Sequence, residues 1–334
     1  MQESLLELPT GYYLEQDTDM LVLRRRVDGA MVGAFSARGA ASEVVQQTVE
    51  GIVRQGPWER STPRLEALSP GTPSPVAAQP LWRAYFFGHF EMLCEEENIT
   101  LGRNGKALTI LKYLLAHRSR PVSQDHLMGW LWPESNLKKA RWSLNSAIHT
   151  LRKLLSACPS STPLNYVVLE EGYYRLCPFI QIATDVEDFD DLYERGRALE
   201  RASRMEEASE HYEKAIELYR GDYLIEDLYE DWTMVERERL SNAYMDMLGR
   251  LALYYMEVGQ HQESIQACYR VLEKDRCHED SFRLLMRCYV KLGLRGRALR
   301  QYRLCEKILR QEYGTAPSPE THALFDSLLR DESA

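Results

Sequence analysis

The sequence predicts a mainly α-helical protein with small β elements. A winged helix-turn-helix domain is followed by a tetratricopeptide-like α-helical repeat domain and preceded by a small α+β unit. Three observations support this fold class. Short strand-like runs precede three amphipathic helices and a hairpin between residues 81 and 180, a 34-residue repeat occupies the C-terminal half, and the two regions carry opposite net charge.

Residues 1–58 form the predicted α+β unit. Strand-like runs at Met20–Val27 and Ala30–Ser36 flank Asp28-Gly29, a dipeptide that favours a two-residue hairpin turn. Apolar residues at helical spacing predict a helix after Ser42. This pattern points to no particular role for the unit. Residues 59–80 are rich in proline and predict a linker.

The domain at residues 81–180 has the element order of a winged helix. Strands come first, then three helices, then a hairpin around Glu171-Gly172. The expected ranges are strands at Ala84–Leu93 and Ile99–Leu101, helices at Leu108–Leu115, Pro121–Trp132 and Leu137–Ala157, and hairpin strands at Tyr166–Glu170 and Tyr173–Cys177.

The third helix combines an apolar stripe with a basic face. Ala140, Leu144 and Ile148 recur at helical spacing with Leu151 and Leu155, which assigns them to the core. The rest of the surface offers cations for phosphates and hydrogen-bonding groups for base edges. Its residues are Lys138, Lys139, Arg141, Asn145, Ser146, His149, Arg152 and Lys153. A merely solvated helix surface is the alternative interpretation.

The charge distribution agrees with a DNA-binding role for this helix. Residues 102–158 hold ten basic and two acidic side chains, a net charge of +8, whereas residues 184–334 hold 22 basic and 32 acidic ones, a net charge of -10. A basic domain joined to an acidic one suggests nucleic acid as the partner of the first and protein as the partner of the second.

The closing hairpin is a second candidate contact with DNA. Because side chains alternate along a strand, Tyr173 or Arg175 would face outward while Tyr174 and Leu176 face the core. The hairpin could then lay its Gly172 turn into the minor groove of DNA. Packing roles for both tyrosines remain the alternative.

An internal repeat predicts the fold of residues 184–330. Leu251, Tyr255 and Gly259 recur 34 residues later as Leu285, Tyr289 and Gly293, and 34 is the tetratricopeptide period. The small and aromatic positions after each glycine also match a third copy, which consists of Ser203, Ala208, Tyr212 and Ala215. Stacked helix pairs of this kind make a concave binding surface.

Residues 82–177 resemble an OmpR-type winged helix in this pattern of strands, basic third helix and hairpin. The resemblance implies that the third helix enters the major groove of double-stranded DNA. It also implies that the loop before that helix contacts RNA polymerase. In this chain the loop comprises Pro133, Glu134, Ser135 and Asn136.

Residues 184–330 resemble the bacterial transcriptional activation domain of SARP-type activators. The matching motifs are Asp185-Val186 with Phe189, Leu218–Leu224, Trp232 with Glu236–Leu240, Glu312-Tyr313-Gly314 and Pro317-x-Pro319-Glu320, with Tyr313 where the family usually has leucine. The resemblance implies a transcription activator that binds repeated promoter elements as a homodimer and recruits RNA polymerase. A cytoplasmic location is expected separately, because no apolar run could span a membrane and the acidic start around Glu3 and Glu7 lacks the basic region of a signal peptide.

Other function classes find less support. The sequence lacks nucleophile-elbow, phosphate-loop and zinc-protease motifs, so we expect no catalytic residues, no metal and no cofactor. No apolar run is long enough to span a membrane. The seven cysteines lack paired spacing and are expected to be buried, reduced thiols. A protein-interaction scaffold with a winged helix that does not bind DNA is the main alternative. An effector or protein partner at the repeats or the N-terminal unit stays open.

Overall fold

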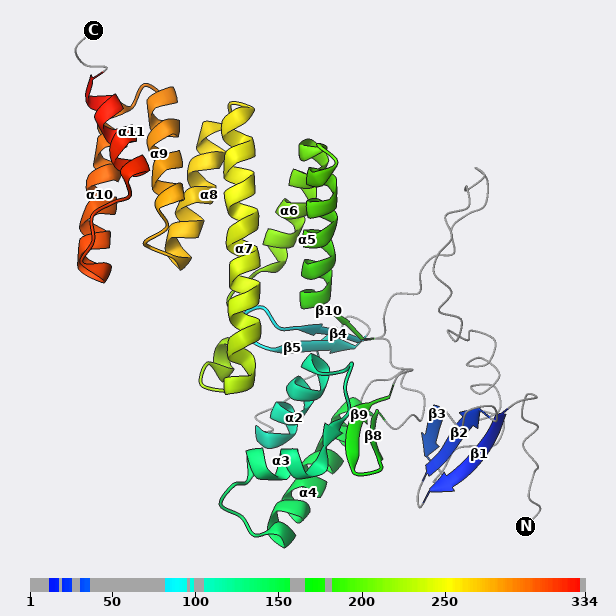
Figure 1. The fold of residues 1–334 in the computed structure, drawn as a ribbon. Helices are drawn as coiled ribbons and strands as arrows, with labels where there is room; N and C mark the ends of the chain where they lie inside the picture. Colours follow the sequence, from blue (N-terminus) through cyan, green and yellow to red (C-terminus); the bar gives the residue numbers. More distant parts are fainter. Residues whose placement is uncertain are drawn as a thin grey trace, which may run out of the picture. The chain divides into compact units, whose positions relative to one another are not determined.

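The computed structural model describes residues 12–17, 20–25, 31–36, 82–94, 97–98, 105–156, 166–177 and 182–330 (Figure 1). Helices dominate these residues, with small sheets beside them, which confirms the predicted fold class. The chain divides into two compact units. One contains the N-terminal strands and Met92–Ile182, and the other combines Ala84–Glu91 with the residues from Ala183 onward.

The N-terminal strands form an antiparallel sheet of order β1-β2-β3, which consists of Tyr12–Asp17, Met20–Arg25 and Met31–Ser36. Met20 pairs with Ser36 and Leu21 with Phe35, which confirms the hairpin between the second and third strands. Strand β1 was not expected from the sequence. The expected helix after Ser42 and the linker at residues 59–80 lie outside the described residues.

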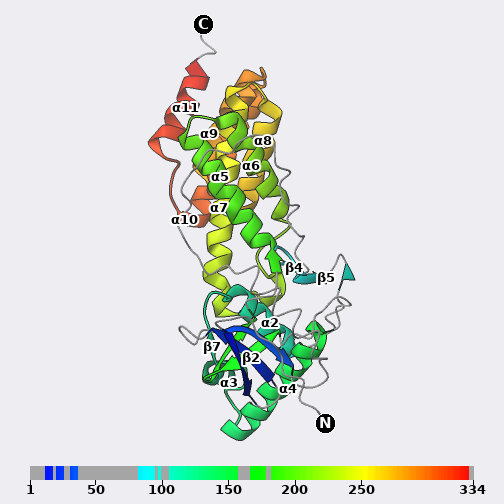
Figure 2. The same cartoon turned by 90° about the vertical axis from the view of Figure 1, so that its right-hand side faces the viewer.

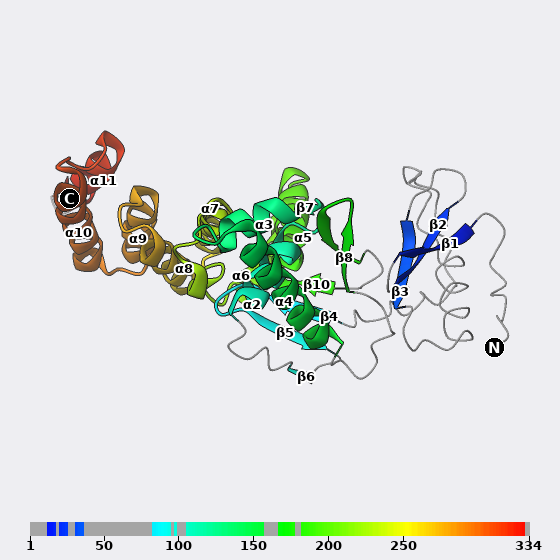
Figure 3. The ribbon, with the colours of Figure 1, turned by 90° about the horizontal axis from the view of Figure 1, so that it is seen from below.

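The winged-helix region contains the three expected helices and the hairpin. Helix α2 spans Gly105–Ala116, α3 spans Gln124–Leu131 and α4 spans Leu137–Leu155. Strands β8 (Val167–Glu170) and β9 (Tyr173–Leu176) pair across Glu171-Gly172, and β7 (Val122–Ser123) joins them in the order β7-β9-β8. Figure 3 gives a second view of these helices and of β8. The glycine at the turn has a φ of +84°, a conformation that few other residues adopt.

A second sheet has the order β10-β4-β5-β6, with β4 at Trp82–Tyr85, β5 at Glu91–Cys94, β6 at Glu97–Asn98 and β10 at Ile182–Thr184. The sequence predicts one strand over Ala84–Leu93, but the structure interrupts it with a loop between β4 and β5 in which Gly88 has a φ of +88°. The second expected strand, Ile99–Leu101, lies outside the described residues.

One cysteine departs from the expectation of reduced thiols. Cys94 is buried and disulfide-bonded. Among the other described cysteines, Cys177, Cys268, Cys288 and Cys305 are buried and free, and Cys277 is free and half-buried. Spacing in the sequence does not reveal a bond between distant thiols, because only the fold brings them together.

The second unit stacks antiparallel helix pairs (Figure 1), and Figure 2 shows the same helices from the side. Helix α5 (Asp185–Arg201) packs on α6 (Met205–Leu218), α7 (Asp231–Glu257) on α8 (His261–Lys274), and α9 (Glu279–Lys291) on α10 (Arg295–Tyr313), with α11 (Pro319–Arg330) after them. A short 3-10 turn, η1, occupies Ile225–Asp227. No helix within the described ranges combines the length and apolarity that crossing a bilayer needs.

The turn inside each pair explains the repeat signal. Ser203, Gly259 and Gly293 occupy the same repeat position, and all three have a positive φ, of 60°, 81° and 71°. This left-handed conformation lets the chain end one helix and start the next within a few residues. The small residues five positions later, Ala208, Ser264 and Ala298, are fully buried, as close packing of the paired helices requires.

Candidate nucleic-acid interface

Helix α4 is anchored at its start and along one side. The side chain of Asn136 accepts a hydrogen bond of 2.9 Å from the backbone N–H of Lys139, which caps the helix. Leu144 and Leu151 are completely buried, and Ala140, Ile148 and Leu155 are nearly so. The predicted core stripe is therefore present, and it fixes which face of α4 points outward.

The outward face carries most of the predicted DNA contacts. Seven side chains are exposed and make no hydrogen bond or ion pair with any residue that the structure describes. They are Lys138, Lys139, Arg141, Asn145, Ser146, His149 and Lys153. No basic residue of this set is neutralised by a neighbouring carboxylate of the described chain. The face thus offers cations and hydrogen-bonding groups that are available to a ligand.

Arg152 has a different environment from its neighbours. Its guanidinium is half-buried and donates to the carbonyl oxygen of Val167 from Nε, at 3.1 Å, and from Nη2, at 2.8 Å. Burial lowers the pKa of Arg152, while the nearby Tyr174 raises it. These bonds tie α4 to strand β8, so the structure gives Arg152 a supporting role that the sequence pattern did not separate from DNA contact.

We expect Arg152→Ala to destabilise the winged-helix region by about 2 kcal/mol, because hydrogen bonds from a charged group are lost and a buried carbonyl is left unpaired. Amide hydrogen exchange along β8 and β9 would measure this change. Lys153→Ala is the matched control, since it removes the adjacent exposed cation and should leave exchange unchanged. If exchange is unchanged in both variants and DNA binding is weakened equally, Arg152 contacts a phosphate and does not stabilise β8.

Of the two candidate DNA contacts in the hairpin, Tyr173 is exposed and Arg175 is half-buried. Tyr173 is 47% exposed and Tyr174 is buried, as the alternation of side chains predicts. Arg175 is half-buried and forms an ion pair with Glu170 on the neighbouring strand. Tyr173 is therefore the accessible candidate at the tip of the wing, whereas part of the charge of Arg175 is already balanced within the hairpin.

The loop expected to contact polymerase lies between α3 and α4. Pro133 and Glu134 are exposed, and Ser135 is half-buried with its backbone N–H bonded to the Trp132 carbonyl at 3.1 Å. Asn136 is exposed but uses its side-chain oxygen as the helix cap. Three of the four residues are thus free of a structural side-chain role within the described chain, and the fourth sets where α4 begins.

Trp142 is a further exposed residue of α4 that the sequence pattern did not single out. This side chain is 74% exposed, although tryptophan is usually among the better buried residue types. It lies three residues before Asn145 and seven before His149, so the helical period places all three on the same face. Trp142 lies outside the Ala140–Leu144–Ile148 stripe, so its spacing in the sequence already indicated a position away from the core.

The second unit includes a segment from outside the helical repeats. The backbone N–H groups of Phe86 and Phe87 donate to the two carboxylate oxygens of Asp185, at 2.8 and 3.0 Å. Phe87 also packs on Phe189 and Tyr219, and Phe86 stacks on Tyr223. Residues 84–91 therefore belong to this unit, and Phe86 and Phe87 lie in its core, although the sequence predicts that the segment starts the winged-helix domain.

The same segment pairs with the loop after α6. Gly88 donates to the Asp222 carbonyl at 3.1 Å, and Leu224 donates to the Phe86 carbonyl at 2.9 Å. Gly221 approaches Gly88 so closely that a Cβ on Gly221 would lie 3.2 Å from the Gly88 Cα. Arg237 completes the loop by donating to the carbonyl oxygens of Tyr223 and Leu224. The family motifs at 218–224 and 236–240 therefore supply residues that bond to the segment at 84–91 and stabilise the loop after α6.

Asp185 is the buried charge of this arrangement. Burial raises its pKa, while the N–H groups of Phe87 and Phe86 and the charge of Arg220 lower it by less. Because the pKa is higher in the folded than in the unfolded chain, the contribution of this group to stability is present at low pH. It is lost as pH rises through the folded pKa.

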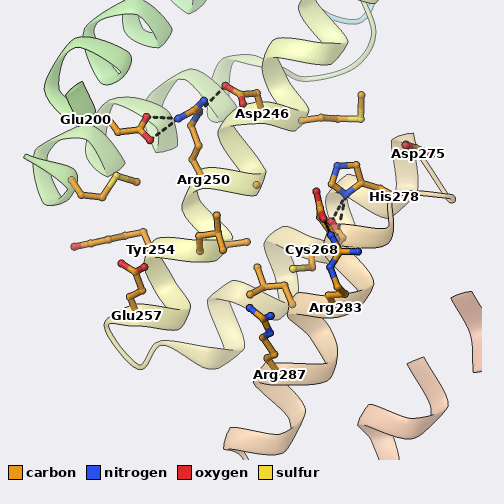
Figure 4. Close-up of a pocket in the computed structure, with 18 of the residues that line it drawn as sticks. Glu200, Asp246, Arg250, Tyr254, Glu257, Cys268, Asp275, His278, Arg283 and Arg287 are labelled. Atoms are coloured by element: carbon orange, nitrogen blue, oxygen red, sulfur yellow. Dashed lines mark hydrogen bonds and ion pairs between the residues drawn. The ribbon is translucent and has the colours of Figure 1, made fainter. Parts of the chain in front are cut away.

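The helical unit also contains a groove of about 1120 Å³, shown in Figure 4. Arg250 lies in it between Glu200 and Asp246, with Arg250 to Glu200 distances of 2.5 and 2.6 Å and an Arg250 to Asp246 distance of 2.7 Å. Arg287 also lines the groove, and it is exposed and pairs with no described residue. The groove is lined by helices of the repeat stack and carries charges of both signs.

Comparisons with known proteins match both regions of the chain. Residues 96–174 match the family described as transcriptional regulatory protein, C terminal, and residues 184–329 match the bacterial transcriptional activator domain. Neither match includes residues 84–91. An OmpR-type winged helix followed by an activator domain defines the class: the chain has the domain composition of a bacterial transcriptional regulator.

The chain is, more particularly, a homologue of the transcriptional regulatory proteins EmbR and MoaR1. EmbR of Mycobacterium tuberculosis is 27% identical over 229 residues, which are 68% of this chain and 58% of EmbR. MoaR1 of the same organism is 24% identical over 243 residues, 73% of this chain and 78% of MoaR1. The chain therefore spans little more than half the length of EmbR.

A solved structure agrees with this relationship. The structure of M. tuberculosis EmbR in complex with a low affinity phosphopeptide matches with a TM-score of 0.61 and 25% sequence identity. The match covers 75% of this chain and 65% of EmbR.

Proposed function

We propose that this protein is a sequence-specific DNA-binding transcription regulator that inserts α4 into the major groove of double-stranded DNA. The observation that carries the proposal is the outward face of α4, where seven polar or charged side chains are exposed and unpaired within the described chain. Unpaired cations on a rigid helix suit the phosphate backbone, and the groups between them suit base edges.

The side chains divide by their chemistry. Lys138, Lys139, Arg141 and Lys153 bind phosphates and set affinity and salt dependence. Asn145 and His149 lie about one turn apart on the same face and form hydrogen bonds with base edges, with Ser146 beside Asn145. Tyr173 at the tip of the wing contacts the adjacent minor groove.

The two matched domains also suggest how the protein acts at a promoter. Two protomers bind repeated promoter elements, and the loop Pro133–Ser135 with the acidic helical unit recruits RNA polymerase, so the protein acts as an activator in the cytoplasm. The groove at Arg250 and Arg287 accepts a protein segment or an effector. The function requires no catalysis and no cofactor.

Selection of bound duplexes from a random pool by the full-length protein tests this function. We expect a repeated motif to be enriched. We expect the double variant Asn145→Ala with His149→Ala to lower the affinity ratio of matched over mismatched duplexes by at least roughly 30-fold, because two base contacts are removed and each contributes on the order of 1–3 kcal/mol of discrimination. Asn242→Ala with His211→Ala, in the helical unit, is the matched control pair.

The scaffold alternative makes the opposite prediction. A winged helix used only for protein contact would enrich no duplex, and its weak binding to DNA would show no dependence on Asn145 or His149. That result would redirect the search for partners to the groove of the helical unit.

A further inference from the structure

Trp142 gives the outward face of α4 one large apolar group. The indole is 74% exposed and makes no ring contact or hydrogen bond with any residue that the structure describes. Leu137, at the start of the helix, is 64% exposed, but by helical spacing it lies in line with the core stripe. Trp142 instead lies opposite that stripe.

The residues that surround Trp142 on α4 are those proposed to contact DNA. Lys138 precedes it by one turn, Asn145 and Ser146 follow it by one turn, and His149 follows it by two. Any ligand that these polar side chains contact must also lie close to the indole. Exposing so much apolar surface to water is unfavourable, and contact with a ligand would remove that cost.

The major groove offers a tryptophan one apolar target. Among the base-edge groups displayed there, only the C5 methyl of thymine is apolar, while the others are hydrogen-bond donors or acceptors. Insertion of the ring between base pairs is less favourable, because it costs a few kcal/mol of unstacking for each step. Edge contact with a methyl group fits a helix whose other side chains also approach base edges.

We propose that Trp142 recognises the C5 methyl group of a thymine in the major groove and so determines part of the operator specificity. This inference rests on the proposed DNA-binding function and deepens it. Trp142 contributes selectivity for thymine over uracil and cytosine at one position of each repeat, while the cations around it contribute affinity for any duplex.

The test replaces single methyl groups in the duplex that wild-type protein enriches. Each thymine is changed in turn to deoxyuridine, which removes only the methyl, and binding is measured by titration. Wild-type protein should lose roughly fourfold in affinity at one thymine of each repeat, the effect expected for one buried methyl-sized group. Trp142→Ala should bind the thymine and deoxyuridine duplexes equally at that position.

Two further variants sharpen the result. Trp142→Phe keeps an aromatic side chain and should retain part of the methyl dependence, whereas Leu137→Ala removes an exposed apolar group of the same helix and should retain all of it. Equal losses at every thymine in wild-type protein and Trp142→Ala would overturn the inference, as would unchanged affinity and methyl dependence in Trp142→Ala. Failure of wild-type protein to enrich any duplex would instead overturn the proposed function, and this inference with it.

Discussion

Replacement of Lys138, Lys139, Arg141 and Lys153 together by alanine is expected to weaken DNA binding on the order of a thousandfold at 0.15 M salt, on any sequence. Each phosphate contact adds about 0.9 to the slope of log affinity against log salt, so the slope should fall by about 3.6. All four side chains are exposed and unpaired within the described chain, so the protein should stay folded. Salt titrations on specific and random duplexes would measure both quantities.

A second quadruple variant controls for net charge. Four exposed cations on α9 and α10 form no ion pair within the described residues: Lys291, Arg300, Arg303 and Lys307. Their replacement by alanine removes the same charge from the helical unit and should leave the slope unchanged. Equal losses in the two variants would mean that overall charge, rather than the face of α4, governs binding.

Asp185→Ala is expected to destabilise the helical unit by about 2 kcal/mol, because the buried N–H groups of Phe86 and Phe87 would lose their acceptors. Residues 84–91 should then detach from the helices more often, because Asp185 accepts the buried hydrogen bonds that hold this segment. Hydrogen exchange at Phe86 and Phe87 in the full-length protein would report the change at the site itself.

Asp191→Ala provides the control for this variant. Asp191 lies on the same helix, α5, but its side chain is 75% exposed and pairs with Arg195 only at 3.9 Å. A surface pair of this kind contributes little to stability. Similar exchange at Phe86 and Phe87 in the two variants would show that aromatic packing on Phe189 and Tyr219 holds the segment without Asp185.

Several features of the site were predictable from local spacing. The core stripe of α4, from Ala140 to Leu155, follows from the helical period, and so does the outward position of Asn145 and His149. The hairpin at Glu171-Gly172 and the repeat turns at Gly259 and Gly293 were visible because those backbone conformations favour glycine.

Other features depend on contacts between distant residues. Arg152 belongs to the basic face by spacing, but its bond to Val167 depends on where β8 passes. Trp142 was not among the residues that the sequence pattern singled out, and the folded helix shows its side chain to be exposed. Spacing alone could not reveal the disulfide bond at Cys94.

The sequence by itself determined the class of protein: its helical periods, its 34-residue repeat and its opposed charges specify a winged helix joined to a repeat domain. Those signals are local, because they depend on residues within a few turns of one another. Only the tertiary structure decided that residues 84–91 belong with the repeats, since Phe86 and Asp185 are separated by 99 positions in the chain. A buried hydrogen bond across such a distance forms only when the whole unit has folded around it.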